Sequence, residues 1–212
     1  MGKKDSSRGL ELAKVIRSGA MGDAAKEYAE LGIDALLASE AAKSIPVIST
    51  IAGIFSATLS IRDHIFCGKL LRFLSQLSEI SEDKRNEMLR KLGENEKFAG
   101  KVGETIIEIL ERMESSKKPE LAAKCFAAYA REGISFEELS RILFALERVP
   151  SLDIDKIGKF SKAKIEDAVK MDESLLLAFV NAGLGMNNGG LDGGVVRPTK
   201  LCQLFLKVGL VA

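Results

Sequence analysis

Apolar residues recur at intervals of three and four along most of the chain, which predicts a mainly α-helical protein. Polar residues that favour helix starts precede several of these stretches, most clearly in the S-x-x-E capping box formed by Ser135 and Glu138. The stretches with helical periodicity are residues 10–16, 23–43, 44–77, 82–93, 98–113, 119–132, 136–149, 153–170, 173–185 and 198–207. We therefore expect a multi-helix bundle with short connections.

The bundle is predicted to be organised around residues 44–61, the longest stretch without a charged residue. Its length is about the 18 residues at which a membrane-spanning helix becomes feasible. On a helix, small residues at spacings of three and four share one face, where a neighbouring backbone can approach closely. This predicted helix-contact face consists of Ser49, Gly53, Ser56 and Ser60.

The opposite face of the same helix carries branched and aromatic side chains, and it faces either a protein core or lipid. Its members are Ile48, Ile51, Phe55 and Leu59. Pro46 near the start and Arg62-Asp63 at the end limit the uncharged length, which favours a central buried helix. Insertion of residues 33–66 into a bilayer is the alternative.

Composition narrows the class of protein. The chain is 46% hydrophobic and 29% charged, which is typical of a globular protein. Its 31 Lys and Arg residues are balanced by 30 Asp and Glu residues, so net charge gives no case for nucleic-acid binding. The three cysteines are far apart and lie among apolar neighbours, which indicates buried free thiols in a reducing compartment.

The segment SSKKP at residues 115–119 is the clearest break in the pattern and predicts a domain boundary. We expect an N-terminal segment (1–22), a helical bundle (23–115) and a smaller helical domain (116–212). The smaller domain is predicted to contain a short β-hairpin, because the glycine-rich residues 186–194 precede the strand-like Val195-Val196.

The end of the chain resembles winged-helix domains. An apolar helix ending in AGLG, a glycine-rich tip, a short strand and the helix PTKLCQLFL follow one another, as in the hairpin and terminal helix of that family. The resemblance implies a recognition helix at residues 136–149. Only Arg141 and Arg148 are basic there, whereas reading a DNA groove needs several basic and polar contacts.

We find no catalytic signature in the sequence. The single histidine, His64, follows Asp63 directly, and adjacent residues on a helix cannot align a base with its orienting group. We therefore predict no catalytic residue, no cofactor and no metal site. The one notable basic cluster, which can contact phosphate or an acidic partner, consists of Lys156, Lys159, Lys162 and Lys164.

These observations predict a non-catalytic helical protein that acts through protein–protein interaction, with a protein partner or a second copy of itself. The first alternative is a membrane-associated effector that inserts residues 33–66. The second is a nucleic-acid-binding regulator that uses the C-terminal domain, although nucleic acid is the least favoured partner. The expected location is the cytoplasm, either free or at a membrane face.

Overall fold

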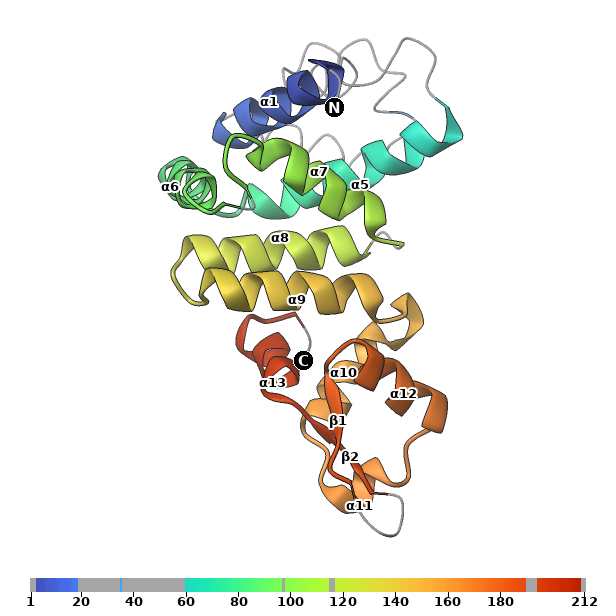
Figure 1. Cartoon of the computed structure of the whole chain (residues 1–212). Coiled ribbons are helices and arrows are strands. Elements are labelled where there is room, and N and C mark those ends of the chain that lie inside the picture. Colours follow the sequence, from blue (N-terminus) through green and yellow to red (C-terminus); the bar gives the residue numbers. More distant parts are fainter. Residues whose placement is uncertain are drawn as a thin grey trace. The chain divides into compact units, whose positions relative to one another are not determined.

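The computed structural model describes residues 3–18, 35, 60–96, 98–114, 117–189 and 194–210 (Figure 1). Helices dominate these residues, and a small two-stranded sheet lies near the C-terminus. This confirms the predicted mainly α fold with a short hairpin. The chain divides into an N-terminal unit, Met1–Arg131, and a C-terminal unit, Glu132–Ala212.

The N-terminal unit is built from α-helices whose apolar faces meet in one core. Helix α1 packs along α7, and α5 packs along α8. Phe73 of α5 meets Phe126 of α8 edge to face, with ring centroids 5.6 Å apart. The helices are α1 (Lys3–Arg17), α5 (Ile61–Leu77), α6 (Glu82–Gly93), α7 (Val102–Arg112) and α8 (Lys117–Ala130).

Two glycines allow α1 and α7 to cross with their backbones in contact. A Cβ atom added at Gly103 would lie 1.8 Å from the carbonyl oxygen of Gly9. A Cβ atom added at Gly9 would meet the side chain and backbone of Glu104. Only glycine fits at such a crossing, so this pair fixes how α1 lies on α7.

Arg85 of α6 ties three segments of the N-terminal unit together. Its side chain is buried and donates hydrogen bonds to the carbonyl oxygens of Ile16 (2.7 Å), Ile80 (2.6 Å) and Ser18 (2.8 Å). Ile16 and Ser18 lie at the C-terminal end of α1, where helix carbonyls lack intrahelical partners and a cation is favourable. The buried charge is thus compensated by carbonyl dipoles, and Arg85 anchors α6 to α1.

The C-terminal unit contains shorter helices and the hairpin, and its helix starts follow the caps expected from the sequence. Ser135 and Glu138 form the predicted capping box, and Asp172 accepts a hydrogen bond from the Leu175 N–H. The elements are α9 (Phe136–Arg148), the 3₁₀ helix η1 (Ser151–Lys156), α10 (Ile157–Ser161), α11 (Ile165–Ala168), α12 (Glu173–Asn181), β1 (Gly185–Asn187), β2 (Val196–Pro198) and α13 (Lys200–Lys207).

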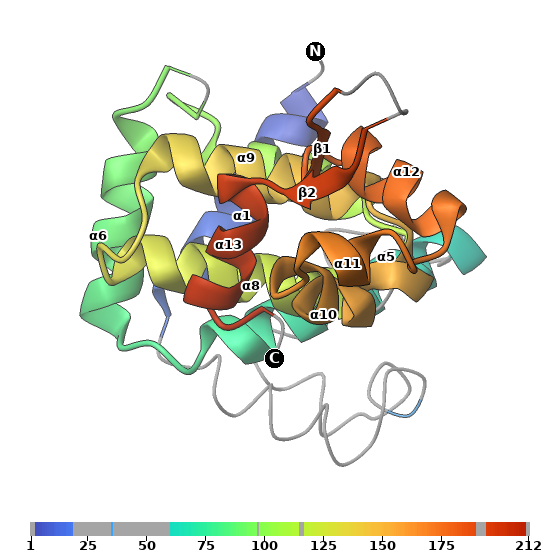
Figure 2. The same ribbon diagram turned by 90° about the horizontal axis from the view of Figure 1, so that it is seen from below.

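Strands β1 and β2 pair antiparallel, with Met186 opposite Arg197. After the hairpin the chain enters α13, whose N-cap Thr199 accepts from the Cys202 N–H. Helix α13 packs beside α10, as Figure 2 shows. The buried side chains of Cys202 and Phe205 face inward from α13 and complete the core of this unit.

The prediction of one continuous helix over residues 153–170 is wrong. The structure has three separate elements there, η1, α10 and α11. The Ser161 carbonyl accepts a hydrogen bond from the Gln203 side chain (2.7 Å), which takes the place of a helical N–H. The Ala163 N–H bonds to the Phe160 carbonyl three residues earlier and closes α10 with a tight turn. A tertiary contact from α13 therefore ends this helix.

The predicted central helix falls mostly outside the described residues. Three residues of the predicted helix-contact face and all four of the opposite face are therefore not described: Ser49, Gly53 and Ser56, and Ile48, Ile51, Phe55 and Leu59. Within the stretch 44–77 that shows helical periodicity, the structure starts a helix at Ile61, and Ser60 is its extended N-cap. In the part of the chain that the structure describes, no helix is both long and apolar enough to cross a bilayer.

The division between the two units also differs from the sequence-based expectation. The expected boundary lies at residues 115–119, whereas the observed division follows Arg131. Helix α8 packs along α5, so the residues after the SSKKP segment contribute to the N-terminal core.

The glycine crossing makes a prediction about stability. Gly103→Ala should destabilise the protein by about 1–3 kcal/mol, the usual cost of overpacking, because the new methyl group meets a backbone oxygen that cannot move away. Gly93→Ala is the control, because its Cβ would meet only the Val102 side chain at 3.8 Å. Urea unfolding followed by circular dichroism measures both variants. Equal unfolding midpoints for the two would contradict this account of the crossing.

Candidate functional site

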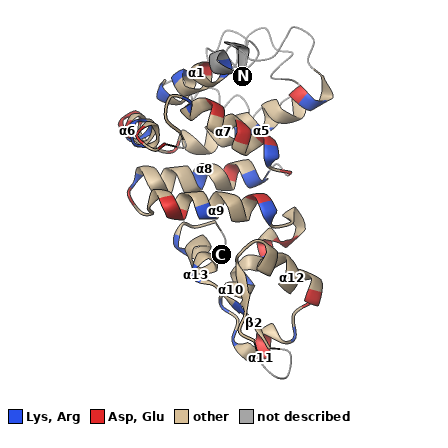
Figure 3. Ribbon diagram, in the orientation of Figure 1, with Lys and Arg blue, Asp and Glu red and all other residues tan. Residues whose placement is uncertain are grey.

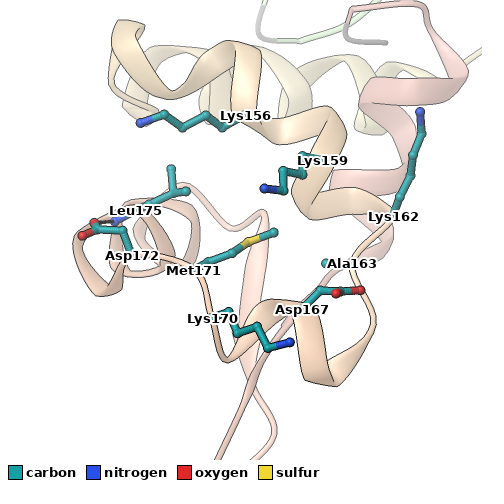
Figure 4. A pocket seen from close by; sticks show the side chains of 9 residues that line it. All are labelled: Lys156, Lys159, Lys162, Ala163, Asp167, Lys170, Met171, Asp172 and Leu175. Carbon is teal, nitrogen blue, oxygen red and sulfur yellow. Dashed lines mark hydrogen bonds between the residues drawn. The ribbon is translucent and has the colours of Figure 1, made fainter.

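A cleft of about 540 Å³ lies in the C-terminal unit and is formed by one continuous part of the chain. The end of η1, helix α10 and the two residues after it make one wall, and α11 with the start of α12 makes the other (Figure 4). Four lysines and two aspartates line it together with three apolar residues. The lining residues are Lys156, Lys159, Lys162, Ala163, Asp167, Lys170, Met171, Asp172 and Leu175.

The four lysines differ in their surroundings. Lys156 forms an ion pair with Asp153, at 2.8 Å between Nζ and Oδ1. Within the described ranges, the structure gives Lys159, Lys162 and Lys170 no ion pair or side-chain hydrogen bond. The cleft therefore carries three lysines without an ion-pair partner among the described residues, and two carboxylates, Asp167 and Asp172, line it as well.

Figure 4 shows how these side chains are arranged. Lys159 and Met171 extend from opposite walls toward the middle of the cleft, whereas Lys162 points away from Met171. Lys170 lies on the other side of Met171 from Lys159. Met171 and Leu175 are half-buried, so they provide an apolar surface between the charged side chains.

Buried contacts hold the elements that line the cleft. Phe160 of α10 and Phe179 of α12 are fully buried, and their ring centroids are 4.8 Å apart. The Gln203 side chain holds the end of α10 through the Ser161 carbonyl. The first contact joins α10 to α12 and the second joins α10 to α13, so core contacts hold two of the elements that line the cleft.

Of the predicted basic cluster, the structure brings Lys156, Lys159 and Lys162 to one cleft. Lys164 is not among the lining residues and instead precedes α11 as its N-cap residue. The sequence-based prediction did not include Lys170, because a continuous helix over 153–170 places it about three turns away from Lys159. Outside this cleft, basic and acidic residues are interspersed along the helices, as their order in the sequence indicates (Figure 3).

The residues around His64 are arranged for capping rather than for catalysis. The Ser60 hydroxyl donates to Asp63 Oδ2 (2.7 Å) and accepts from the Asp63 N–H (3.2 Å). The hydrogen bond from the Ser60 side chain, together with one from its backbone N–H, lowers the pKa of Asp63. Asp63 therefore stays ionised as the partner of a helix cap, and the Ser60 hydroxyl is directed to it.

The three cysteines are free and buried, as the sequence predicted. Burial raises the pKa of Cys67 and of Cys202 to about 12, and it raises the pKa of Cys125 further. Because the thiolate is the reactive form, none of these thiols is poised to act as a nucleophile near neutral pH.

Other candidate features are less suited to a ligand. The two arginines of α9 are engaged within that helix: Arg141 pairs with Glu137 (2.9 Å), and Arg148 lies 4.1 Å from the centre of the Phe144 ring. Helix α12, which directly precedes the hairpin, carries no basic residue. Among the described residues, no group of three His, Cys, Asp or Glu side chains is placed to hold a metal ion.

A second cleft, of about 640 Å³, lies in the N-terminal unit at the start of α5. One of its cations, Lys69, is already directed to the last carbonyls of α7, at 3.3 Å from the Glu111 oxygen. Its lining residues are Arg8, Ile61, Arg62, Asp63, Ile65, Phe66, Lys69 and Glu111.

Comparisons with family models, with curated proteins and with solved structures gave no match to this chain. The winged-helix resemblance therefore stays a prediction, and the candidate site has to be judged on its own geometry.

The burial of the thiols makes a prediction about reactivity. Iodoacetamide at about pH 8, near the pKa of an exposed cysteine, should label none of the three cysteines in the native protein and all three in urea. The physical reason is that the raised pKa leaves almost no thiolate and that the core excludes the reagent. Mass spectrometry counts the labels. Rapid labelling of Cys67 in the folded protein would contradict the assignment of inert thiols.

Proposed function

We propose that this protein is non-catalytic and acts by binding a protein partner, an acidic segment of which occupies the cleft between α10 and α12. The observation that carries the proposal is the set of lysines without ion-pair partners, Lys159, Lys162 and Lys170, at one cleft of the described structure. Carboxylates of a partner would compensate these charges, and complementary charge speeds association and selects the partner.

The remaining chemistry of the chain agrees with a binding role. The thiols have raised pKa values, and the serine and aspartate nearest His64 are committed to a helix cap. Three free cysteines in the core fit a reducing compartment, so we place the protein in the cytoplasm.

The proposal is tested with short fluorescent peptides of acidic, neutral and basic composition, whose binding to the full chain is measured by anisotropy. We expect the acidic peptides to bind best, and their affinity to fall as salt shortens the Debye length from about 10 Å at 0.1 M to about 3 Å at 1 M. The double variant Lys159→Glu/Lys170→Glu should bind acidic peptides about tenfold more weakly, because two exposed attractions become repulsions.

The control is Lys200→Glu/Lys207→Glu, which changes net charge equally at exposed positions of α13 outside the cleft. It should bind as the wild type does. Equal losses in both double variants would mean that net charge, not the cleft, governs binding. Tighter, lysine-dependent binding of duplex DNA than of acidic peptides would overturn the proposal in favour of the nucleic-acid alternative.

Membrane association is the second candidate function, and exposed apolar residues at the start of α5 favour it. Ile61 is 84% exposed and Ile65 is 59% exposed, and Arg62 lies between them in the sequence. Apolar side chains beside cations suit an interfacial contact with anionic lipid. Phe66 is buried in the folded chain, so insertion of residues 33–66 would have to end before it.

Sedimentation with phosphatidylserine-containing vesicles tests this second candidate. Ile61→Ser/Ile65→Ser should lower vesicle affinity about a hundredfold, because the variant loses two apolar anchors and each accounts for about a factor of ten. Leu152→Ser/Leu177→Ser is the control, since both residues are exposed but belong to the C-terminal unit. Absence of vesicle binding by the wild type, or equal losses in both variants, would rule this candidate out.

A further inference from the structure

The arrangement within the lysine-lined cleft defines the chemistry of the partner segment more closely than charge alone. Resting on the proposed function, we infer that the segment carries an apolar residue flanked by carboxylates. The apolar residue packs on Met171 and Leu175, and the carboxylates meet Lys159 and Lys170.

The first argument is the apolar surface inside the cleft. Met171 and Leu175 are half-buried, although they line an open wall between charged side chains. Asp172, which lies between them, caps α12 by accepting from the Leu175 N–H (3.0 Å), so the turn that presents the two side chains is fixed. A purely anionic ligand would leave this apolar surface in water, whereas an apolar residue would cover it.

The second argument is the placement of the lysines. Lys156 is compensated by Asp153, and Lys162 points away from the middle of the cleft (Figure 4). The remaining two, Lys159 and Lys170, lie on opposite sides of Met171 and do not converge on one point. A single phosphate group needs convergent donors, so this arrangement favours two separate carboxylates over one compact anion.

The third argument concerns the two aspartates of the cleft, Asp167 and Asp172. An unbroken acidic run along the cleft would bring carboxylates against them, which is unfavourable for like charges. A segment that places an uncharged apolar residue between its carboxylates avoids that contact. The same aspartates disfavour polyanions such as nucleic acid.

Three peptides of equal length test the inference on the full chain by fluorescence anisotropy. The first has a central leucine flanked by glutamates, the second replaces the leucine with serine, and the third replaces the glutamates with glutamines. We expect the second peptide to bind about tenfold more weakly than the first, because one apolar contact is lost. The third should bind weakly and without dependence on salt.

Variants of the protein test whether the leucine of the peptide contacts Met171. Met171→Ala should weaken the first peptide but not the second, so that the difference between the two peptides shrinks, as expected for a direct contact. Leu177→Ala is the matched control, because Leu177 is an exposed apolar residue of α12 outside the cleft. It should preserve the difference between the peptides.

The outcomes separate this inference from the proposed function. The leucine and serine peptides could bind equally well to the wild type and both lose binding in Lys159→Glu/Lys170→Glu. That result would overturn the inference and leave the acidic-partner function standing. Failure of both acidic peptides to bind better than the glutamine peptide would overturn both. Displacement of the first peptide by pyrophosphate at concentrations comparable to the peptide's own would also overturn the inference, because it would identify a compact-anion site.

Discussion

The packing of Phe160 against Phe179 is the contact on which the candidate site depends. These buried rings join α10 to α12, two of the elements that line the cleft. The lysine side chains of the cleft are exposed, so core packing can fix only the backbone from which they extend. Aromatic packing in the core therefore determines where the charges lie, and the charges determine what can bind. A change at either ring would move a wall of the cleft and reposition Lys159 relative to Met171.

The N-terminal unit depends on constraints of a different kind. The backbones of α1 and α7 touch at Gly9 and Gly103, and the Arg85 guanidinium binds three carbonyl oxygens from two segments. Both contacts act on the backbone, so they fix the positions of helices without using apolar side chains. Arg85 carries a charge into the core, and its cost is offset by the carbonyl dipoles that surround it.

Local features of the fold could be predicted from the sequence, whereas long-range contacts could not. The Ser135–Glu138 capping box and the hairpin depend on neighbouring residues, and both are present. The basic cluster was recognisable because its four lysines, Lys156, Lys159, Lys162 and Lys164, lie close together in the chain. The break after α10 was missed, since the Gln203 side chain that satisfies the Ser161 carbonyl comes from 42 residues further on. Lys170 was missed for the same reason, because only the break brings it to the cleft.

The most direct test of the acidic-partner site is nuclear magnetic resonance of the ¹⁵N-labelled full chain, titrated with the leucine–glutamate peptide. The account predicts that amide shifts change progressively and are concentrated at Lys159, Lys170, Met171 and Leu175. Shift changes confined to α9, or spread over the surface without a preference for these residues, would contradict it.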